Sequence, residues 1–98
     1  MSPWKFTDPP DTAVLADRRI IQEGDWIAHV FHDESDGGWQ FHNDQAASLT
    51  EDDAMIVSLR NIVEHDPSVS ELADLPIGYR AWRHAKDTAW QRAEILER

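Results

Sequence analysis

The sequence contains no cysteine, which excludes disulfide bonds, thiolate metal ligands and a cysteine nucleophile. It has no apolar run near the ~20 residues that a membrane-spanning helix needs. The N-terminal stretch MSPWKFTDPP lacks the basic region and apolar run of a secretory signal. No glycine-rich phosphate-binding or dinucleotide-binding motif occurs. We therefore predict a cytoplasmic protein, and we expect no cofactor.

Basic residues are also scarce, because nine Lys or Arg face 19 Asp or Glu and give a net charge of −10. Residues 20–59 hold nine of the acidic side chains and no Lys or Arg, whereas residues 80–98 hold five of the nine basic ones. Phosphate backbones and anionic membranes repel such a chain, so we expect neither nucleic-acid nor membrane binding. The uneven charge permits a strongly negative face, which is either a solvated surface or a surface for a basic partner.

Length and composition indicate a single domain, residues 1–98, because 41% of the residues are hydrophobic and the chain is long enough to bury a core. Residues 1–11 contain three of the five prolines and are expected to form an irregular arm that docks through Trp4 and Phe6. β-Branched and aromatic residues in alternation predict strands over 12–16, 26–32, 39–43 and 79–83, with 18–22 as an extension of the first strand after a kink.

The segment 54–63 (AMIVSLRNIV) fits two arrangements. In one, Thr50 and Asp53 form a capping box for a single helix that begins near Glu51. In the other, a β-prone strand is followed by a helix that Ser58 caps.

Two further helices are predicted towards the C-terminus. Asp66 followed by Pro67 is a typical helix start and predicts a helix to about Asp74. Asp87 is expected to cap a last helix. Its apolar side would consist of Ala89, Trp90, Ala93 and Leu96. The element order predicts an α+β fold with a small antiparallel sheet of about four or five strands and two or three helices on one face.

The stretch HVFHDESDGGWQFH, residues 29–42, predicts a β-hairpin around an acidic loop that ends in glycines. If His29 and His42, the first and last residues of this stretch, face each other across the hairpin, then His32 lies opposite Trp39. A metal site would need three converging ligands. On a strand, however, His29 and His32 point to opposite faces, and His29 with His42 gives only two imidazoles. We therefore predict no metal ligands here.

Trp26, Trp39 and Trp82 all lie on predicted strands, where an aromatic residue usually packs in the core. The alternative is an exposed aromatic anchor at a protein interface, ringed by acids. Trp39 follows the Gly37–Gly38 turn directly, so we expect it to lie nearest to a surface rim.

Several short motifs, each present once, follow one another in a defined order along residues 12–83. The order is the strand AHVF (28–31), an acidic gap with Asp36, GWQF (38–41), a hydrophobic run with Leu59, DPSV (66–69) and LPIG (75–78). In this the chain resembles a family of small bacterial proteins of unknown function, grouped by genomic context with the immunity proteins of polymorphic toxin systems. The resemblance implies a strand and then a helix over 55–63, and it implies no catalytic residue.

Two classes of function follow. The first is a non-enzymatic acidic protein-binding module, in the immunity-like case one that neutralises a basic toxin by covering its active surface. Its predicted binding residues are Asp33, Glu34, Asp36 and Trp39, with Glu51, Asp52 and Asp53 if the two acidic segments lie together. The second is a small metal-dependent hydrolase that uses His29 and His42 with a carboxylate. A bacterial scaffold protein without a toxin partner is the third reading.

Overall fold

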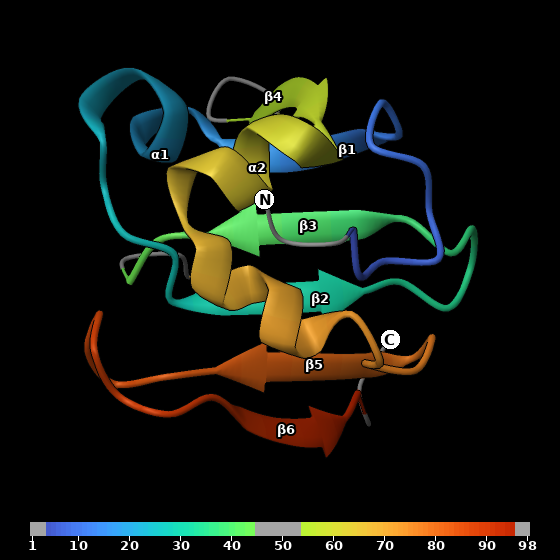
Figure 1. The fold of residues 1–98 in the computed structure, drawn as a ribbon. Coiled ribbons are helices and arrows are strands. Elements are labelled where there is room, and N and C mark those ends of the chain that lie inside the picture. Colours follow the sequence, from blue (N-terminus) through green and yellow to red (C-terminus); the bar gives the residue numbers. More distant parts are fainter. Residues whose placement is uncertain (1–3, 45–53, 96–98) are drawn as a thin grey trace.

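The computed structural model describes residues 4–44 and 54–95, which form one mixed sheet of six strands with three helices (Figure 1). The elements are β1 (Ala13–Asp17), α1 (Arg18–Glu23), β2 (His29–His32), β3 (Trp39–His42), β4 (Ala54–Ser58), α2 (Leu59–His65), the 3-10 helix η2 (Pro67–Leu72), β5 (Tyr79–Trp82) and β6 (Gln91–Glu94). The strand order is β4-β1-β3-β2-β5-β6. The α+β class is confirmed.

The sheet departs from the prediction in strand number and in direction. It has six strands, where four or five were expected, and β1 runs parallel to β3 while the other neighbouring pairs are antiparallel. The parallel pair forms because β1 does not continue into a hairpin with β2. Instead α1 and the following segment carry the chain across, so that β2 and β3 enter the sheet together.

The predicted hairpin is present, and it has the register that the sequence offered as a condition. His29 pairs with His42 and His32 pairs with Trp39, and β2 lies between β3 and β5. The closing loop has a backbone hydrogen bond from the Asp33 N–H to the Gly38 carbonyl, 2.7 Å long. Gly37 adopts a φ of +72°, the left-handed conformation for which glycine carries no steric penalty. The turn chemistry of the loop therefore sets the register of the hairpin.

Residues 18–22 are helical, so the prediction that they extend the first strand is wrong. The Asp17 carboxylate accepts a hydrogen bond from the Arg19 N–H at 2.9 Å and caps α1, while Gly24 ends the helix in the left-handed conformation. Ile20 is fully buried. A short capped helix that buries one isoleucine outweighs the β-preference of the sequence.

The segment 54–63 is a strand followed by a helix, and the single helix beginning near Glu51 is wrong. The Ser58 hydroxyl accepts a hydrogen bond from the Asn61 N–H at 3.1 Å and caps α2. The helix predicted from Pro67 is present as η2, where the Asp66 carboxylate accepts from the Ser68 N–H at 3.0 Å.

The C-terminal helix is the largest error, because residues 91–94 form β6 beside β5. Between β5 and β6, Tyr79 pairs with Glu94 and Trp82 pairs with Gln91. A helix of about ten residues is only marginally stable without packing, whereas β6 satisfies the backbone groups of β5, which would otherwise be a sheet edge.

The helices α2 and η2 lie over one face of the sheet (Figure 1). Alternate strand residues of that face join the helices in one buried cluster, whose largest members include Phe41, Val30, Leu59, Ile62 and Leu72. The intervening strand residues point to the opposite face. No helix among residues 4–44 and 54–95 is long and apolar enough to cross a membrane.

The N-terminal arm packs on this core, as predicted. The ring of Phe6 lies edge-on to that of Trp39, with 5.3 Å between the ring centroids, and Trp4 packs against Phe6. The Trp4 indole N–H donates to the Asp8 carbonyl at 2.7 Å and holds the arm in a turn.

Candidate functional site

Three segments that are distant in the sequence meet at one end of the sheet, on the right in Figure 1: the arm, the loop 33–38 and the segment 73–78. This is the end at which β2 finishes and at which β1, β3 and β5 begin. We call it the acidic end. Its carboxylates and apolar side chains are Asp8, Asp33, Glu34, Asp36, Asp74, Ile56 and Ile77.

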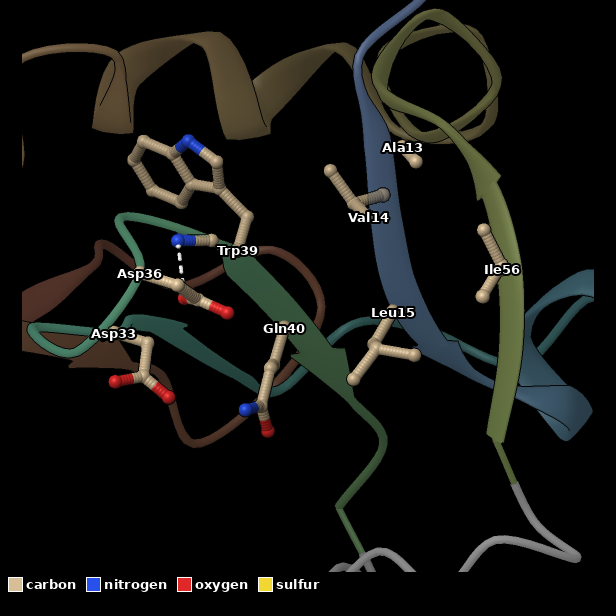
Figure 2. Close-up of a pocket in the computed structure, with 9 residues that line it drawn as sticks. Ala13, Val14, Leu15, Asp33, Asp36, Trp39, Gln40 and Ile56 are labelled. Carbon is tan, nitrogen blue, oxygen red and sulfur yellow. Dashed lines mark hydrogen bonds between the residues drawn. The ribbon is translucent and has the colours of Figure 1, made fainter.

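The acidic loop holds two of its carboxylates in fixed positions. The Asp33 carboxylate accepts hydrogen bonds from the N–H and hydroxyl of Ser35, at 2.8 and 2.9 Å. The Asp36 carboxylate accepts from the Gly38 N–H at 2.8 Å, the bond drawn in Figure 2. Carboxylates that are fixed before binding lose less conformational entropy when a partner arrives.

A pocket of about 280 Å³ opens beside these carboxylates, between β1, β3 and β4. Leu15, Gln40 and Ile56 form its floor, and they are direct neighbours across the three strands because Leu15 pairs with both Gln40 and Ile56. In Figure 2 the side chains of Leu15, Gln40 and Asp33 point away from the helices. The pocket therefore belongs to the sheet face that α2 and η2 leave uncovered.

A second pocket, of about 400 Å³, lies on the other side of the same loop. Its lining includes Asp8, Asp74 and Ile77, together with Gly37 of the loop. Ile56 in the first pocket is 72% exposed and Ile77 in the second is 55% exposed; they are the two exposed large hydrophobic residues of the described chain. Each isoleucine stands alone in its pocket, so it adds apolar contact area there without forming a continuous apolar patch.

The structure brings together part of the predicted binding set. Asp33 and Asp36 line the first pocket, and Glu34 lies exposed at the tip of the same loop. Glu51, Asp52 and Asp53 lie outside the described residues, so their position relative to the loop stays a prediction.

The expectation that Trp39 lies at a surface rim is wrong, since its side chain is only 2% exposed. Its indole stacks on the His32 ring at 3.8 Å, and its N–H donates to the Asp8 carboxylate at 3.4 Å. Figure 2 shows the indole pointing towards the helices, away from the pocket floor. Strand alternation places residue 39 on the core face, so Trp39 supports the loop from within.

Leu15, Ile56 and Ile77 were missed as site residues. Leu15 and Ile56 occupy hydrophobic strand patterns that are typical of buried positions, and nothing local shows which strand face the helices cover. Ile77 follows a proline in a loop and has no periodicity to place it. Only the pairing of β1 with β3 and β4 brings Leu15 and Ile56 beside the acidic loop.

The other titratable cluster is the histidine pair on the uncovered sheet face. Burial lowers the pKa of His42 below its usual 6.5, the facing His29 lowers it further, and Asp17 opposes the shift. Burial and then the charge of Arg80 lower the pKa of His29, while Asp44 opposes. The His42 Nδ1 is buried and makes no hydrogen bond. Within residues 4–44 and 54–95, no three His, Cys, Asp or Glu side chains form a group that could hold a metal.

Stability is expected to fall as the pH decreases below 6.5, the ordinary histidine value. Both pKa values are lower in the folded state. Between pH 6.5 and the folded pKa values, His29 and His42 therefore bind more protons in the unfolded chain than in the folded protein. The contribution is complete above 6.5 and is lost as the pH falls through the folded values. Carboxylates such as Asp17, whose pKa is lowered from 3.8, change the stability with pH only in a more acidic range. Urea unfolding at several pH values between about 7.5 and 5 measures the effect.

The double variant His29→Gln/His42→Gln is expected to flatten this dependence. The matched control is His84→Gln, which removes an exposed histidine. Equal slopes of stability against pH for the double variant and the wild type would show that His29 and His42 do not cause the pH dependence.

No family model, curated protein or solved structure matches this chain. The resemblance to immunity-associated bacterial proteins therefore stays a prediction, and the function is inferred from the geometry of the acidic end.

Proposed function

We propose that this protein is a non-enzymatic, acidic protein-binding module that binds a basic protein through its acidic end. In the immunity-like case the partner is a toxin whose active surface the module covers. The observation that carries the proposal is the arrangement at the acidic end: an acidic loop closed by internal hydrogen bonds lies between two pockets, each with carboxylates and an exposed isoleucine.

Charge and apolar area at the acidic end have complementary roles in such binding. No Lys or Arg is among the described residues that line either pocket, and the two linings hold the carboxylates of Asp8, Asp33, Asp36 and Asp74. Such a field speeds encounter with a cationic partner, and charge complementarity selects among partners. Ile56 and Ile77 supply apolar contact area that stabilises the complex after encounter.

Pull-down from the native host at low and high salt, followed by mass spectrometry, identifies the partner. We expect one basic protein in stoichiometric amount that high salt releases. Metal analysis of protein purified without a histidine tag tests the alternative hydrolase. Stoichiometric zinc or iron would contradict a purely binding function.

Neutralising the loop, as Asp33→Asn/Glu34→Gln/Asp36→Asn, is expected to slow association with that partner about tenfold at low salt. The salt dependence of the association rate should also become weaker, because fewer charges steer the encounter. Asn retains the side-chain oxygen that accepts the backbone hydrogen bonds of the loop, so the fold should be kept. Surface plasmon resonance at several salt concentrations measures both effects.

A matched control removes the same charge elsewhere. Glu23, Glu64 and Asp87 are exposed residues outside both pockets, and the variant Glu23→Gln/Glu64→Gln/Asp87→Asn changes the net charge equally. If the two triple variants slow association by the same factor, net charge alone governs the encounter and the acidic end is not the contact surface.

A further inference from the structure

We infer that the chain forms a symmetric dimer in which the edge strand β4 pairs antiparallel with β4 of a second copy. β4 and β6 lie at the two edges of the sheet (Figure 1). Of these two edge strands, β4 is the one suited to a copy of itself. Such a dimer needs no basic partner and is therefore separate from the proposed function.

The backbone of β4 presents hydrogen-bonding groups along its outer side. The Leu59 N–H donates to the Thr12 carbonyl at 2.8 Å, which makes these two residues a hydrogen-bonded pair of the β1–β4 ladder. Hydrogen-bonded pairs alternate along an antiparallel ladder, so Met55 and Val57 bond to β1 while the N–H and carbonyl of Ile56 point outward. Within residues 4–44 and 54–95, no strand lies beyond β4. These outward groups are a template for one more strand.

The side chains of β4 suit a second copy of the same strand. A two-fold axis at Ile56 places the two Ile56 side chains opposite each other. The flanking pairs are then Met55 with Val57 and Ala54 with Ser58. Side chains paired in this way have Cβ atoms about 4.5–5.5 Å apart, so uncharged side chains meet on both faces of the sheet. Ile56 is 72% exposed in the single chain, and its contact with the same residue of the copy removes apolar area from water.

Charge favours the β4 edge over the β6 edge. β4 has the sequence AMIVS and lacks the charged residues and prolines that protect exposed edges from pairing. β6 has the sequence QRAE, in which Arg92 and Glu94 place charges along the other edge. Two copies therefore meet at β4 without a charged residue in the paired strands, although each chain has a net charge of −10.

The antiparallel orientation also separates the acidic ends of the two copies. β1 begins at the acidic end and β4 runs antiparallel to β1, so β4 finishes there. In the dimer each β4 finishes beside the start of the other, which puts the two acidic ends at opposite ends of the joined sheet. Pairing at the edge leaves both faces of the sheet uncovered by the copy, so each acidic end stays accessible to a partner.

Sedimentation equilibrium of the full chain measures the dimer. Five paired residues form a small interface, so we expect a dissociation constant of about 10–100 μM. The average mass should rise with concentration from 11.3 kDa towards twice that value. High salt should strengthen the dimer, because it screens the repulsion between two negative chains, whereas it weakens a complex with a basic partner. A monomer at every concentration up to about 500 μM, in low and in high salt, would overturn the inference.

Proline at position 56 tests the edge itself. Ile56→Pro removes an N–H that points outward and keeps the hydrogen bonds to β1, and edge strands accept proline at such positions. We expect the dimer to weaken at least about tenfold, because two intermolecular hydrogen bonds are lost.

The matched control is Arg92→Pro on the other edge. The Ile95 N–H donates to the Gly78 carbonyl at 2.8 Å, so the alternation along the β5–β6 ladder places the Arg92 N–H on the outer side of β6. This variant should leave the dissociation constant of the dimer unchanged. Equal weakening by both proline variants, or weakening by Arg92→Pro alone, would contradict pairing through β4.

A disulfide gives a second test, which decides the question if circular dichroism shows that Ile56→Pro does not fold. The chain has no cysteine, so Ile56→Cys introduces a single thiol. The two residues at the axis form a hydrogen-bonded pair with Cα atoms about 5.5 Å apart, within the ~4.4–6.8 Å that a disulfide spans. Oxidation of the two thiols by diamide should therefore convert most of this variant to a covalent dimer on a non-reducing gel.

Ile77→Cys is the control for random collision of thiols. Ile77 is an exposed isoleucine outside β4, with 55% of its surface accessible. This variant should stay largely monomeric under the same oxidation. Equal cross-linking of the two cysteine variants, or no cross-link of folded Ile56→Cys, would overturn the inference and leave the proposed function standing.

Discussion

Replacing Arg83 with alanine is expected to lower the free energy of unfolding by about 3–5 kcal/mol, the usual cost of removing one partner from a buried ion pair. The Arg83 side chain is 2% exposed and lies beside the Asp66 carboxylate, itself 15% exposed. Its guanidinium also donates to the Ile27 carbonyl at 2.8 Å and to the Ser68 hydroxyl at 3.0 Å. The Trp90 ring lies 4.2 Å from it. Truncation would leave Asp66 desolvated and without its counter-charge.

The pKa of Asp66 is set by opposing effects, and Arg83 contributes two of those that lower it. Burial raises the pKa of Asp66, but hydrogen bonds from Ser68 and Arg83 and the charge of Arg83 lower it more, so that the net shift is downwards. Without Arg83 only the raising effect of burial and the hydrogen bonds of Ser68 remain. The variant should therefore lose stability at a higher pH than the wild type as acid is added.

Arg92→Ala is the matched control, because it breaks an ion pair that faces solvent. Arg92 bonds to Asp74 at 2.8 Å, but Asp74 is 80% exposed, and such pairs contribute about 0–1 kcal/mol. Urea unfolding followed by tryptophan fluorescence measures both variants. If the two arginine variants lose equal stability, the buried position of Arg83 has no energetic consequence.

Ile56→Lys is expected to weaken binding of the basic partner about 100-fold. The new ammonium group would stand in the pocket beside the acidic loop, where the basic partner is proposed to bind, and like charges brought together at an interface cost several kcal/mol. Residue 56 is 72% exposed on the edge strand β4, where lysine is well tolerated, so the fold should be retained. Isothermal titration calorimetry with the identified partner measures the change.

Gln22→Lys is the control for net charge, because it adds the same positive charge to an exposed position on α1. This change should alter the affinity by less than about threefold. Circular dichroism and unfolding curves establish that both lysine variants are folded. Unchanged affinity of folded Ile56→Lys would show that the partner does not contact this pocket.

The hairpin and the helix caps are the parts of the fold that local chemistry decides. The glycine-ended loop fixes the pairing of His29 with His42, and Ser58 and Asp66 cap α2 and η2 through side-chain hydrogen bonds over two or three residues. These interactions span few positions, so the sequence predicts the hairpin and the Asp66 cap and offers the Ser58 cap as one of two arrangements. The composition likewise establishes an acidic chain without thiol chemistry.

The sequence predictions fail where hydrogen bonding and burial in the folded protein outweigh the intrinsic preference of the residues. Residues 91–94 have a helical pattern, but they complete the edge of β5, and Trp90 packs over Arg83. Residues 18–22 have β-prone side chains, but the Asp17 cap and the burial of Ile20 make them helical. In both segments the deciding interaction is a hydrogen bond or a packing contact that single-residue preferences do not contain.

The candidate site likewise has one part that the sequence predicts and one part that only the tertiary structure establishes. The sequence by itself determined the acidic loop, with Asp33, Glu34 and Asp36 together on one hairpin turn, because these residues are adjacent in the chain. Only the tertiary structure decided that Leu15 and Ile56 form a floor beside that loop, and that Trp39 points into the core. The physical reason is that strand order and the face covered by α2 and η2 are set by the burial of apolar area across the whole sheet, which no short stretch of sequence specifies.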